Sequence, residues 1–453
     1  MKWLLLFILA VIGFTACIGQ SPAYTPAAPL DEVRVEITDY VPQNGYNSEA
    51  MPDDADLPIA ESGFPILQIA SSYDPFTVER EFWHDGSLSL TALTAEHSFR
   101  DVNVRLRGRG NSTWIRGEDK RPLRFRFEEA RTLFDSPYPH RDWILLANHF
   151  DLSLLRNYAA FYLAAQMGSM DFVPSSQFVH LYVNDEYMGV YQIVDERDFG
   201  PGRMTLAFNP DPALSEFLFE LDGHAFRGRD GEEGIDFFVV DERAYTIRFP
   251  GPNDHDGHLE YLRDFVEKVN QSIHSHDFEA ISSAIDLQSF VDFYIVQELF
   301  KNIDVGNFSV FMQLRGQNEN RKIYFGPVWD FDRSAGNTLY WAEPEHVFAA
   351  VYNVWFREML AVPEISALVS SRWNEITDGP IEKTIERLRF LADQYEEEFS
   401  RNFERHNVWE NNPPWFDDML PEVNTSIVGF SSQAEYLINW LAARRAWLTD
   451  RVF

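Results

Sequence analysis

The sequence has almost no cysteine. Cys17 is the only one among 453 residues, so neither an intramolecular disulfide nor a cysteine-based zinc site can form. Hydrophobic residues make up 45% of the chain, which is enough to bury a sizeable core and excludes global disorder. The length allows one large domain or two ordinary ones.

Positive charge is also scarce. The chain has 38 Lys and Arg residues against 71 Asp and Glu residues, which gives a formal net charge of -33. A surface this acidic repels nucleic-acid phosphates, so we do not expect nucleic acid as a partner. The charge suits a protein that attracts cations and basic peptides, although solubility alone is the simpler explanation.

Long hydrophobic runs are missing after the first residues. Residues 1–17 combine a basic start, an apolar run from Trp3 to Phe14 that is too short to span a bilayer, and a small residue before Cys17. This pattern is typical of a bacterial lipoprotein signal peptide, with an ordinary signal peptide as the alternative. Residues 18–60 are rich in Pro, Ala, Ser, Asp and Glu, which predicts a flexible tether. We therefore expect an extracytoplasmic, membrane-anchored lipoprotein of the bacterial cell envelope, lipidated at Cys17.

The folded region is predicted from residue 61 to 453, and its first part has the alternation of strands. Apolar and polar residues alternate over residues 102–107 and again over 123–127, which predicts two strands joined by a turn-rich segment at 108–114. A hairpin is predicted over residues 177–194, with its turn at Asn184-Asp185.

Helical spacing dominates the later part. A helix is predicted over residues 151–168, with Asp151 as its N-cap and Gly168 near its end. Arg156 and Asn157 in this helix are expected to make buried hydrogen bonds. Further predicted elements are helices around 261–269 and 290–296, a strand pair at 309–314 and 322–325, and helices over 350–453. Strands first and helices afterwards predict an α+β, bilobal fold, β-rich over 61–250 and helical over 251–453.

Three short segments carry residues suited to chemistry. The first is the Gly-rich turn RGRGNSTW, whose backbone N–H groups can approach an anion. Lys120, Arg124 and Arg126 follow with the same parity along the next strand, which predicts a cationic stripe that binds phosphate. The alternative is a solvated strand face whose cations pair with the abundant carboxylates.

The other two segments are acidic. Asp304 and Asn307 lie in a loop after a helix and are suited to be a catalytic base and a metal ligand, or else to form an Asx turn. Asp330 and Asp332 follow a strand on either side of Phe331, and two such carboxylates suit a hard cation such as magnesium. A charged loop is the alternative.

The order of the three segments indicates a reaction class. Phosphoryl transfer depends on positioning and on neutralisation of charge, and a phosphate cradle, cations, a base and metal-binding carboxylates serve those purposes. A carbohydrate-active enzyme is disfavoured, because carboxylates two residues apart on one extended segment do not straddle a sugar.

Five stretches resemble the CotH kinase family of spore-coat-type atypical protein kinases. They are RLRGRGNSTW with KRPLRFRF, WILLANHFDLSLLRNYAAFYLAAQMG, FVHLYVNDEYMGVYQIVDE, NIDVGNFSVF and FGPVWDFDRSAGN, in that order. The resemblance covers about residues 95–340 well and the closing stretch from about Trp415 to Arg451 loosely. It implies a kinase-like fold that binds ATP and Mg²⁺ or Mn²⁺ between two lobes. It also implies transfer of the γ-phosphate to Ser or Thr of extracytoplasmic proteins, the protein substrate lying in the envelope or on the cell surface.

The resemblance implies roles for single residues. Asp304 matches the catalytic aspartate, Asn307 a metal-binding asparagine, and Asp330 the metal aspartate, with Asp332 as its close companion. It implies that one of Lys120, Arg124 and Arg126 contacts phosphate, and that Glu196 pairs with that cation.

The sequence also departs from ordinary kinases. No HRD tripeptide precedes Asp304, and the loop GRGNST only approximates the usual Gly-rich loop. A lipoprotein outside the cytoplasmic membrane also meets little ATP, so the alternative function is a catalytically inactive structural or adhesion lipoprotein on a kinase-like scaffold.

Overall fold

The computed structural model describes residues 63–453 except 73, 75, 77–79, 81, 118–119, 135, 137, 198–201, 228–235, 252–256 and 318–319. These described residues belong to one compact unit, Tyr40–Phe453. The predicted signal peptide, the tether and Cys17 lie outside them. No helix in the described part of the chain is both long and apolar enough to cross a membrane.

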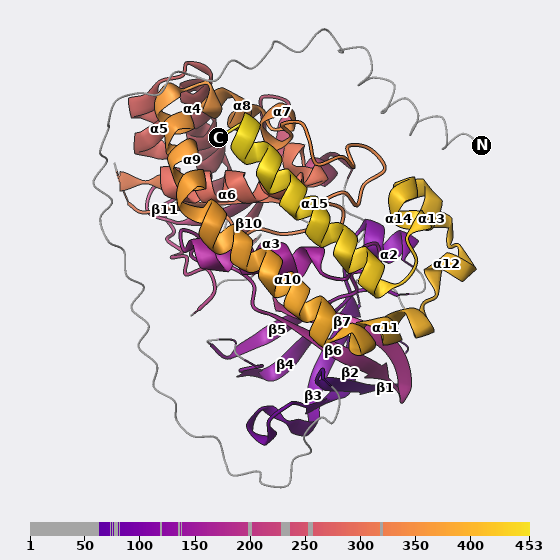
Figure 1. The fold of residues 1–453 in the computed structure, drawn as a ribbon. Helices are drawn as coiled ribbons and strands as arrows, with labels where there is room; N and C mark the ends of the chain where they lie inside the picture. The colour runs from indigo at the N-terminus through magenta and orange to yellow at the C-terminus, as the bar shows by residue number, and fades with distance from the viewer. Residues whose placement is uncertain are drawn as a thin grey trace, which may run out of the picture. The chain divides into compact units, whose positions relative to one another are not determined.

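The first sheet is a closed barrel of seven strands (Figure 1). Its order is β1 (Ile66–Ser71), β2 (His84–Thr91), β3 (Phe99–Gly108), β4 (Leu123–Arg131), β5 (His140–Leu146), β7 (Glu186–Asp195) and β6 (Ser176–Val183). Neighbouring strands are antiparallel except β6 and β1, whose parallel pairing closes the barrel. The predicted strands at 102–107 and 123–127 are confirmed as β3 and β4, and the alternation that revealed them places Leu106 and Phe125 inside the barrel.

The hairpin prediction is also confirmed. β6 and β7 are joined by Asn184 and Asp185, whose φ angles of 49° and 65° are left-handed. Two consecutive left-handed residues form the turn whose twist matches that of the flanking strands, and Asn and Asp tolerate this conformation better than most residues.

The connection between β3 and β4 is more ordered than predicted. It contains the short helix α2 (Ser112–Arg116), where the sequence indicated only turns. Trp114 of this helix is buried against Gly108, where an added Cβ would lie 2.2 Å from the indole ring. The aromatic side chain therefore anchors the connection, and glycine at 108 makes room for it.

The second sheet has five antiparallel strands in the order β12 (Lys322–Phe325), β11 (Val310–Arg315), β8 (Phe217–Leu221), β10 (Arg243–Phe249) and β9 (Phe237–Val240). β11 and β12 are the strand pair expected at 309–314 and 322–325. Because β11 pairs with β8, this sheet contains strands from both sides of residue 250.

Helices make up most of the chain after β10. The α-helices after α2 are α3 (Arg156–Met167), α4 (His258–His274), α5 (Phe278–Ala284), α6 (Leu287–Phe300), α7 (Ala349–Tyr352), α8 (Val354–Leu360), α9 (Pro363–Ile376), α10 (Glu382–Gln394), α11 (Glu396–Arg405), α12 (Val408–Asn411), α13 (Pro414–Met419), α14 (Glu422–Ser426) and α15 (Phe430–Arg451). Shorter helical segments are η2 (Ala95–His97), η3 (Gly223–Arg227), η4 (Ile303–Gly306) and η6 (Thr377–Ile381). The α+β class is confirmed, and the bilobal arrangement remains a prediction.

The start of α3 differs from the prediction. The helix begins at Arg156 rather than near Asp151, because Leu154 has a φ of 61°, which an α-helix cannot contain. Asp151 still acts as a cap, since its carboxylate accepts hydrogen bonds from the backbone N–H groups of Ser153 and Arg156. Gly168 ends the helix in the left-handed conformation, as predicted.

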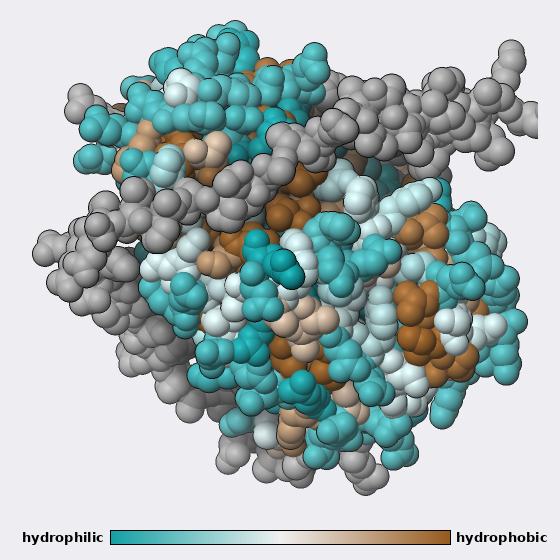
Figure 2. Space-filling model, turned by 45° about the horizontal axis from the view of Figure 1, so that its top comes forward, coloured by the Kyte–Doolittle hydropathy of each residue, from teal (hydrophilic) through white to brown (hydrophobic). Residues whose placement is uncertain are grey.

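Two large apolar cores hold the described residues together. One fills the barrel, and the other joins the helices to the second sheet. Helix α6 lies deep in the second core, since every residue from Ser289 to Phe300 is buried. On the face drawn in Figure 2 the surface is mainly hydrophilic, with the hydrophobic residues in separate patches.

Candidate functional site

The segment after β12 presents two carboxylates on either side of a buried ring. Phe331 is buried, and its backbone N–H donates to Oδ1 of Asn157 at 2.7 Å. Asp330, with a φ of 58°, adopts a conformation that is uncommon for a residue other than glycine, and its Oδ2 accepts from the Ser309 hydroxyl at 2.9 Å. Asp330 and Asp332 are both partly exposed. The anchored ring therefore fixes the positions from which both carboxylates reach solvent.

Helix α3 holds the next residues of the same segment. Arg156 is fully buried and donates from Nε to the carbonyl of Ser334 at 2.9 Å and from Nη2 to that of Ala335 at 3.1 Å. Its Nη1 lies 2.5 Å from Oδ1 of Asp151, which is fully buried as well. The buried hydrogen bonding expected of Arg156 and Asn157 is thus confirmed, and it positions residues 330–335.

Asp304 lies on η4, directly after the central helix α6. Lys301 ends α6 in the left-handed conformation, and the side chain of Asn302 accepts from the backbone N–H of Asp304 at 3.1 Å. The Asx turn considered for this segment therefore exists, but Asn302 makes it. Asp304 is partly exposed and Asn307, at the end of the turn, is exposed. Both side chains remain available for chemistry at the surface.

The three aspartates share one electrostatic environment. Burial raises the pKa of Asp304 to about 7, and the negative charge of Asp330 adds to the effect. Burial, followed by the charges of Asp330 and Asp304, likewise raises the pKa of Asp332 to about 7. Arg333 opposes both shifts. Arg333 had no role in the sequence interpretation, and its Nε is buried without a hydrogen-bond partner among the residues that the structure describes.

The donors suit a magnesium or manganese ion only in part. Among the described residues, no group of three or more His, Cys, Asp or Glu side chains is arranged to hold a metal ion. Mg²⁺, however, is commonly bound through one or two carboxylates, with phosphate oxygens and water as its other ligands. Two adjacent aspartates that repel each other fit that mode, and the metal roles of Asn307, Asp330 and Asp332 remain predictions.

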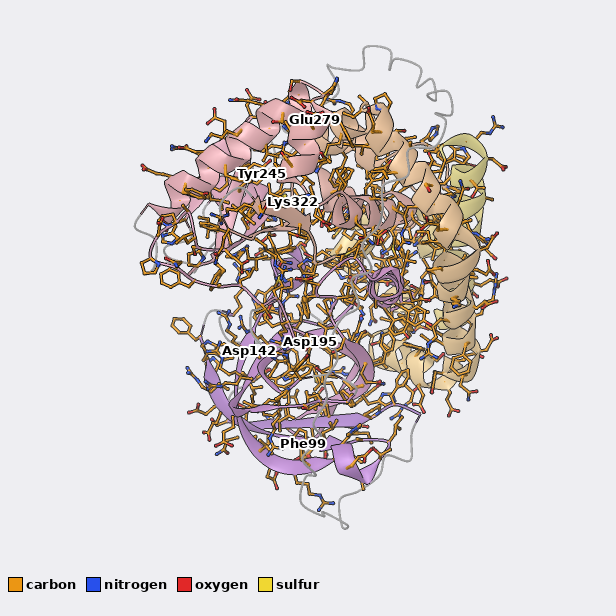
Figure 3. The ribbon with its side chains drawn as sticks, turned by 90° about the vertical axis from the view of Figure 1, so that its left-hand side faces the viewer. Phe99, Asp142, Asp195, Tyr245, Glu279 and Lys322 are labelled. Atoms are coloured by element: carbon orange, nitrogen blue, oxygen red, sulfur yellow. The ribbon has the colours of Figure 1, made fainter. Side chains whose placement is uncertain are left out.

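The cationic side of the site comes from the barrel. Arg124 on β4 pairs with Asp142 at 2.8 Å and with Glu196 at 3.3 Å, and Arg126 pairs with Asp142 at 2.9 Å. The expected partnership of Glu196 with a cation therefore involves Arg124. Figure 3 shows Asp142 and Asp195 near one end of the barrel, and Phe99 near the opposite end.

Lys120 lies apart from this group. Its side chain is fully buried, and the ammonium donates to the carbonyls of Ala147 and Val190, both at 2.6 Å. Burial holds its pKa well below the usual value. Contrary to the prediction, Lys120 does not share the strand face of Arg124, because β4 begins only at Leu123. We therefore assign it no phosphate contact.

Two arginines that the sequence interpretation left without a role join the site. The guanidinium of Arg197 lies 4.3 Å from the ring centroid of Trp329, and that of Arg109 lies 5.6 Å from it. The charge of Asp330 acts on Arg197, which places this cation beside the acidic group. The sequence could have indicated both arginines by their neighbours, because Arg109 belongs to the Gly-rich turn and Arg197 directly follows Glu196.

The pKa of Glu196 shows how strongly these cations act on it. Its burial alone would raise its pKa, but Arg124, Arg197 and Arg109 together lower it to about 2. Glu196 is therefore ionised at neutral pH and orients the arginines around it.

The family model described as CotH kinase protein matches residues 106–448. The chain belongs to the CotH kinase family. The match spans the end of β3, the barrel strands that follow it in the chain, both acidic segments and most of α15. No curated protein matches this CotH family member.

In this CotH family chain, the fold brings most of the predicted residues into two adjoining groups. The acidic group contains Asp304, Asp330 and Asp332, and the cationic group contains Arg124 and Arg126 with Glu196. The acidic group and the cationic group adjoin where Arg197 stacks on Trp329, next to Asp330. Lys120 belongs to neither group.

Proposed function

We propose that this chain is an atypical protein kinase that transfers the γ-phosphate of ATP to Ser or Thr of extracytoplasmic proteins. The observation that carries the proposal is the contact between the two groups. Arg197 stacks on Trp329 next to Asp330, so cations suited to phosphate lie beside carboxylates suited to a metal ion.

The cation that such a reaction needs is Mg²⁺ or Mn²⁺, held by Asp330 and Asp332 with Asn307 close by. A bound divalent ion would neutralise part of the phosphate charge. In the protein alone Arg333 provides a nearby opposite charge for Asp304 and Asp332, but burial and, after it, the repulsion between the aspartates still raise the pKa values of both groups.

The side chains of the protein supply the other functions. Arg109, Arg124 and Arg197 bind phosphate oxygens, and Glu196 keeps Arg124 in place. Asp304 accepts the proton of the acceptor hydroxyl, a role that suits a carboxylate whose pKa is about 7, because the base is then partly ionised at neutral pH and still basic enough to take a proton.

The proposal also places the protein outside the cytoplasm, attached to the membrane by a lipid on Cys17. This part is supported by the sequence pattern of residues 1–17.

The test is a calorimetric titration of the full chain with ATP, with and without Mn²⁺ or Mg²⁺. We expect saturable, metal-dependent binding that Asp330→Asn abolishes without lowering the unfolding midpoint. Asp393→Asn on α10, an exposed position, is the matched control for the change in charge and should bind as the wild type does. Normal metal-dependent binding by Asp330→Asn would contradict the proposal, and no binding by the folded wild type would support the inactive scaffold.

A further inference from the structure

The segment between β12 and α7 exposes large apolar side chains a few residues after Asp332. Leu339, Tyr340 and Trp341 are 39%, 64% and 48% exposed. We call these three consecutive residues the apolar face. Single exposed apolar residues are ordinary, but a group of them on one surface marks an interaction site.

Hydrogen bonds to the backbone hold the segment that carries this face. Trp440 of α15 donates to the carbonyl of Ala342 at 2.6 Å, and Arg444 donates to the carbonyls of Pro344 and His346, both at 2.7 Å. The segment therefore lies against α15 (Figure 1). Since the backbone makes these contacts, the aromatic side chains are left to face solvent.

The far end of the segment is fixed by a buried ion pair. Arg444 and Glu298 are both fully buried and lie 2.6 Å apart, and Glu298 also accepts from the backbone N–H groups of Phe348 and Ala349. Trp341 itself has a φ of 70°, which is strained for a bulky residue. Strained residues that the surrounding structure holds in place are frequent at ligand-binding sites. A surface ordered in advance also loses little entropy on binding.

The apolar face lies beside the turn that carries Asp304. The ring of Trp341 is 5.8 Å from that of Tyr352, and a Cβ on Gly306 would lie 3.0 Å from the carbonyl oxygen of Tyr352. The side chain of Asn353 donates to the carbonyl of Val305 at 2.8 Å, which joins α7 to the same turn. A molecule on this face would therefore lie near the turn that carries the candidate catalytic base.

The charge around the apolar face limits which molecules can bind there. Glu343 and Glu345 are exposed on the same segment, and the whole chain has a formal net charge of -33. A second copy of this chain or an anionic membrane surface would be repelled, whereas a polypeptide without acidic residues would not.

We infer that the apolar face binds the protein substrate. The substrate segment that it binds has a large apolar side chain close to its Ser or Thr and no acidic residue beside it. The inference rests on the proposed kinase function and adds the substrate class. The apolar side chain packs against Tyr340 and Trp341 and brings the acceptor hydroxyl to Asp304.

The experiment uses a positional-scanning library of synthetic peptides with a central Ser or Thr, the full chain, ATP and Mn²⁺. The wild type should select a large apolar residue at one position near the acceptor and reject Asp and Glu there. The double variant Tyr340→Ser/Trp341→Ser should lose this selection, with kcat/KM for the best peptide falling about 10-fold through KM because the docking contact is lost. Its affinity for ATP should not change. Phe390→Ser on α10, which removes another exposed aromatic side chain, should behave as the wild type does.

The outcomes separate the two proposals. Phosphorylated peptides without apolar selection, or selection that survives in the double variant, would overturn the docking proposal and leave the kinase intact. Self-association of the wild type that the double variant loses would show that the face joins two copies instead. Absence of both ATP binding and phosphorylation would refute the kinase function and with it the docking proposal.

Discussion

The buried pair of Arg156 and Asp151 offers a direct test of how residues 330–335 are positioned. In Arg156→Met the carboxylate of Asp151 loses its cation in a fully buried position, and the carbonyls of Ser334 and Ala335 lose a donor. Removing one partner of a buried ion pair costs about 3–5 kcal/mol. The hydrogen bonds from Ser153 that remain on Asp151 keep the expected loss of stability within that range.

Urea unfolding at pH 7.5 and calorimetric titration with ATP and Mn²⁺ measure the two consequences. We expect the free energy of unfolding to fall by about 3–5 kcal/mol and the ATP affinity to fall as well, because the segment that carries Asp330 and Asp332 loses its anchor. The double variant Asp151→Asn/Arg156→Met removes the unpaired charge and should recover part of the stability but not the affinity.

Arg372→Met is the matched control. Arg372 pairs with the fully buried Asp292 at 2.8 Å and donates to the carbonyl of Met167, but it makes none of the contacts that hold residues 330–335. It should lower stability and leave ATP affinity unchanged. The reasoning would be refuted if Arg156→Met unfolded at the wild-type midpoint, or if it lost stability and bound ATP normally.

Two further predictions concern basic side chains of the barrel and the helices that follow it. Lys120→Met should lower the free energy of unfolding by about 1–3 kcal/mol, because two buried carbonyls lose their donor, and it should leave ATP binding unchanged. Arg124→Met, in contrast, should weaken ATP binding. Urea unfolding and calorimetric titration of both variants check these expectations. His406 is buried and donates to the carbonyl of Met188, and burial, with the charge of Lys120 adding to it, lowers its pKa to about 3. The unfolded chain therefore takes up this proton first as the pH falls below about 6.5, and stability is lost down to pH 3. Between pH 7.5 and 5, urea unfolding should show a loss about 2 kcal/mol larger in the wild type than in His406→Gln, since carboxylates that titrate in the opposite sense are common to both proteins. An equal loss in both proteins would mean that the imidazole is already protonated in the folded state.

Much of the local structure could be predicted from the sequence, because its causes are local. Alternation identified β3 and β4, and Asn184-Asp185 identified the turn of the β6–β7 hairpin. Local patterns failed where a single backbone conformation decided the result. Leu154 delays the start of α3, and Lys120 lies before β4 begins rather than on its face.

The candidate site was predictable in its carboxylates and not in its cations. Asp304, Asp330 and Asp332 were chosen from their order along the chain, and the fold brings them within electrostatic range of one another. Arg197 takes part because it stacks on Trp329, a contact between residues far apart in sequence. The pairing of β8 with β11 is equally non-local, and no pattern within either strand predicts it.

The electrostatics of the site bear on the choice between a kinase and an inactive scaffold. Without a ligand, burial and then the mutual repulsion of the aspartates raise the pKa values of Asp304 and Asp332. Arg333 opposes both effects but does not cancel them, so the ionised carboxylates cost stability in this arrangement. A divalent cation together with a phosphate group would remove the cost, since the cation neutralises the aspartates and the arginines beside Trp329 bind the phosphate. Carboxylates with raised pKa values next to arginines that can bind phosphate are thus explained by a ligand that carries both charges, which favours nucleotide binding over a purely structural role.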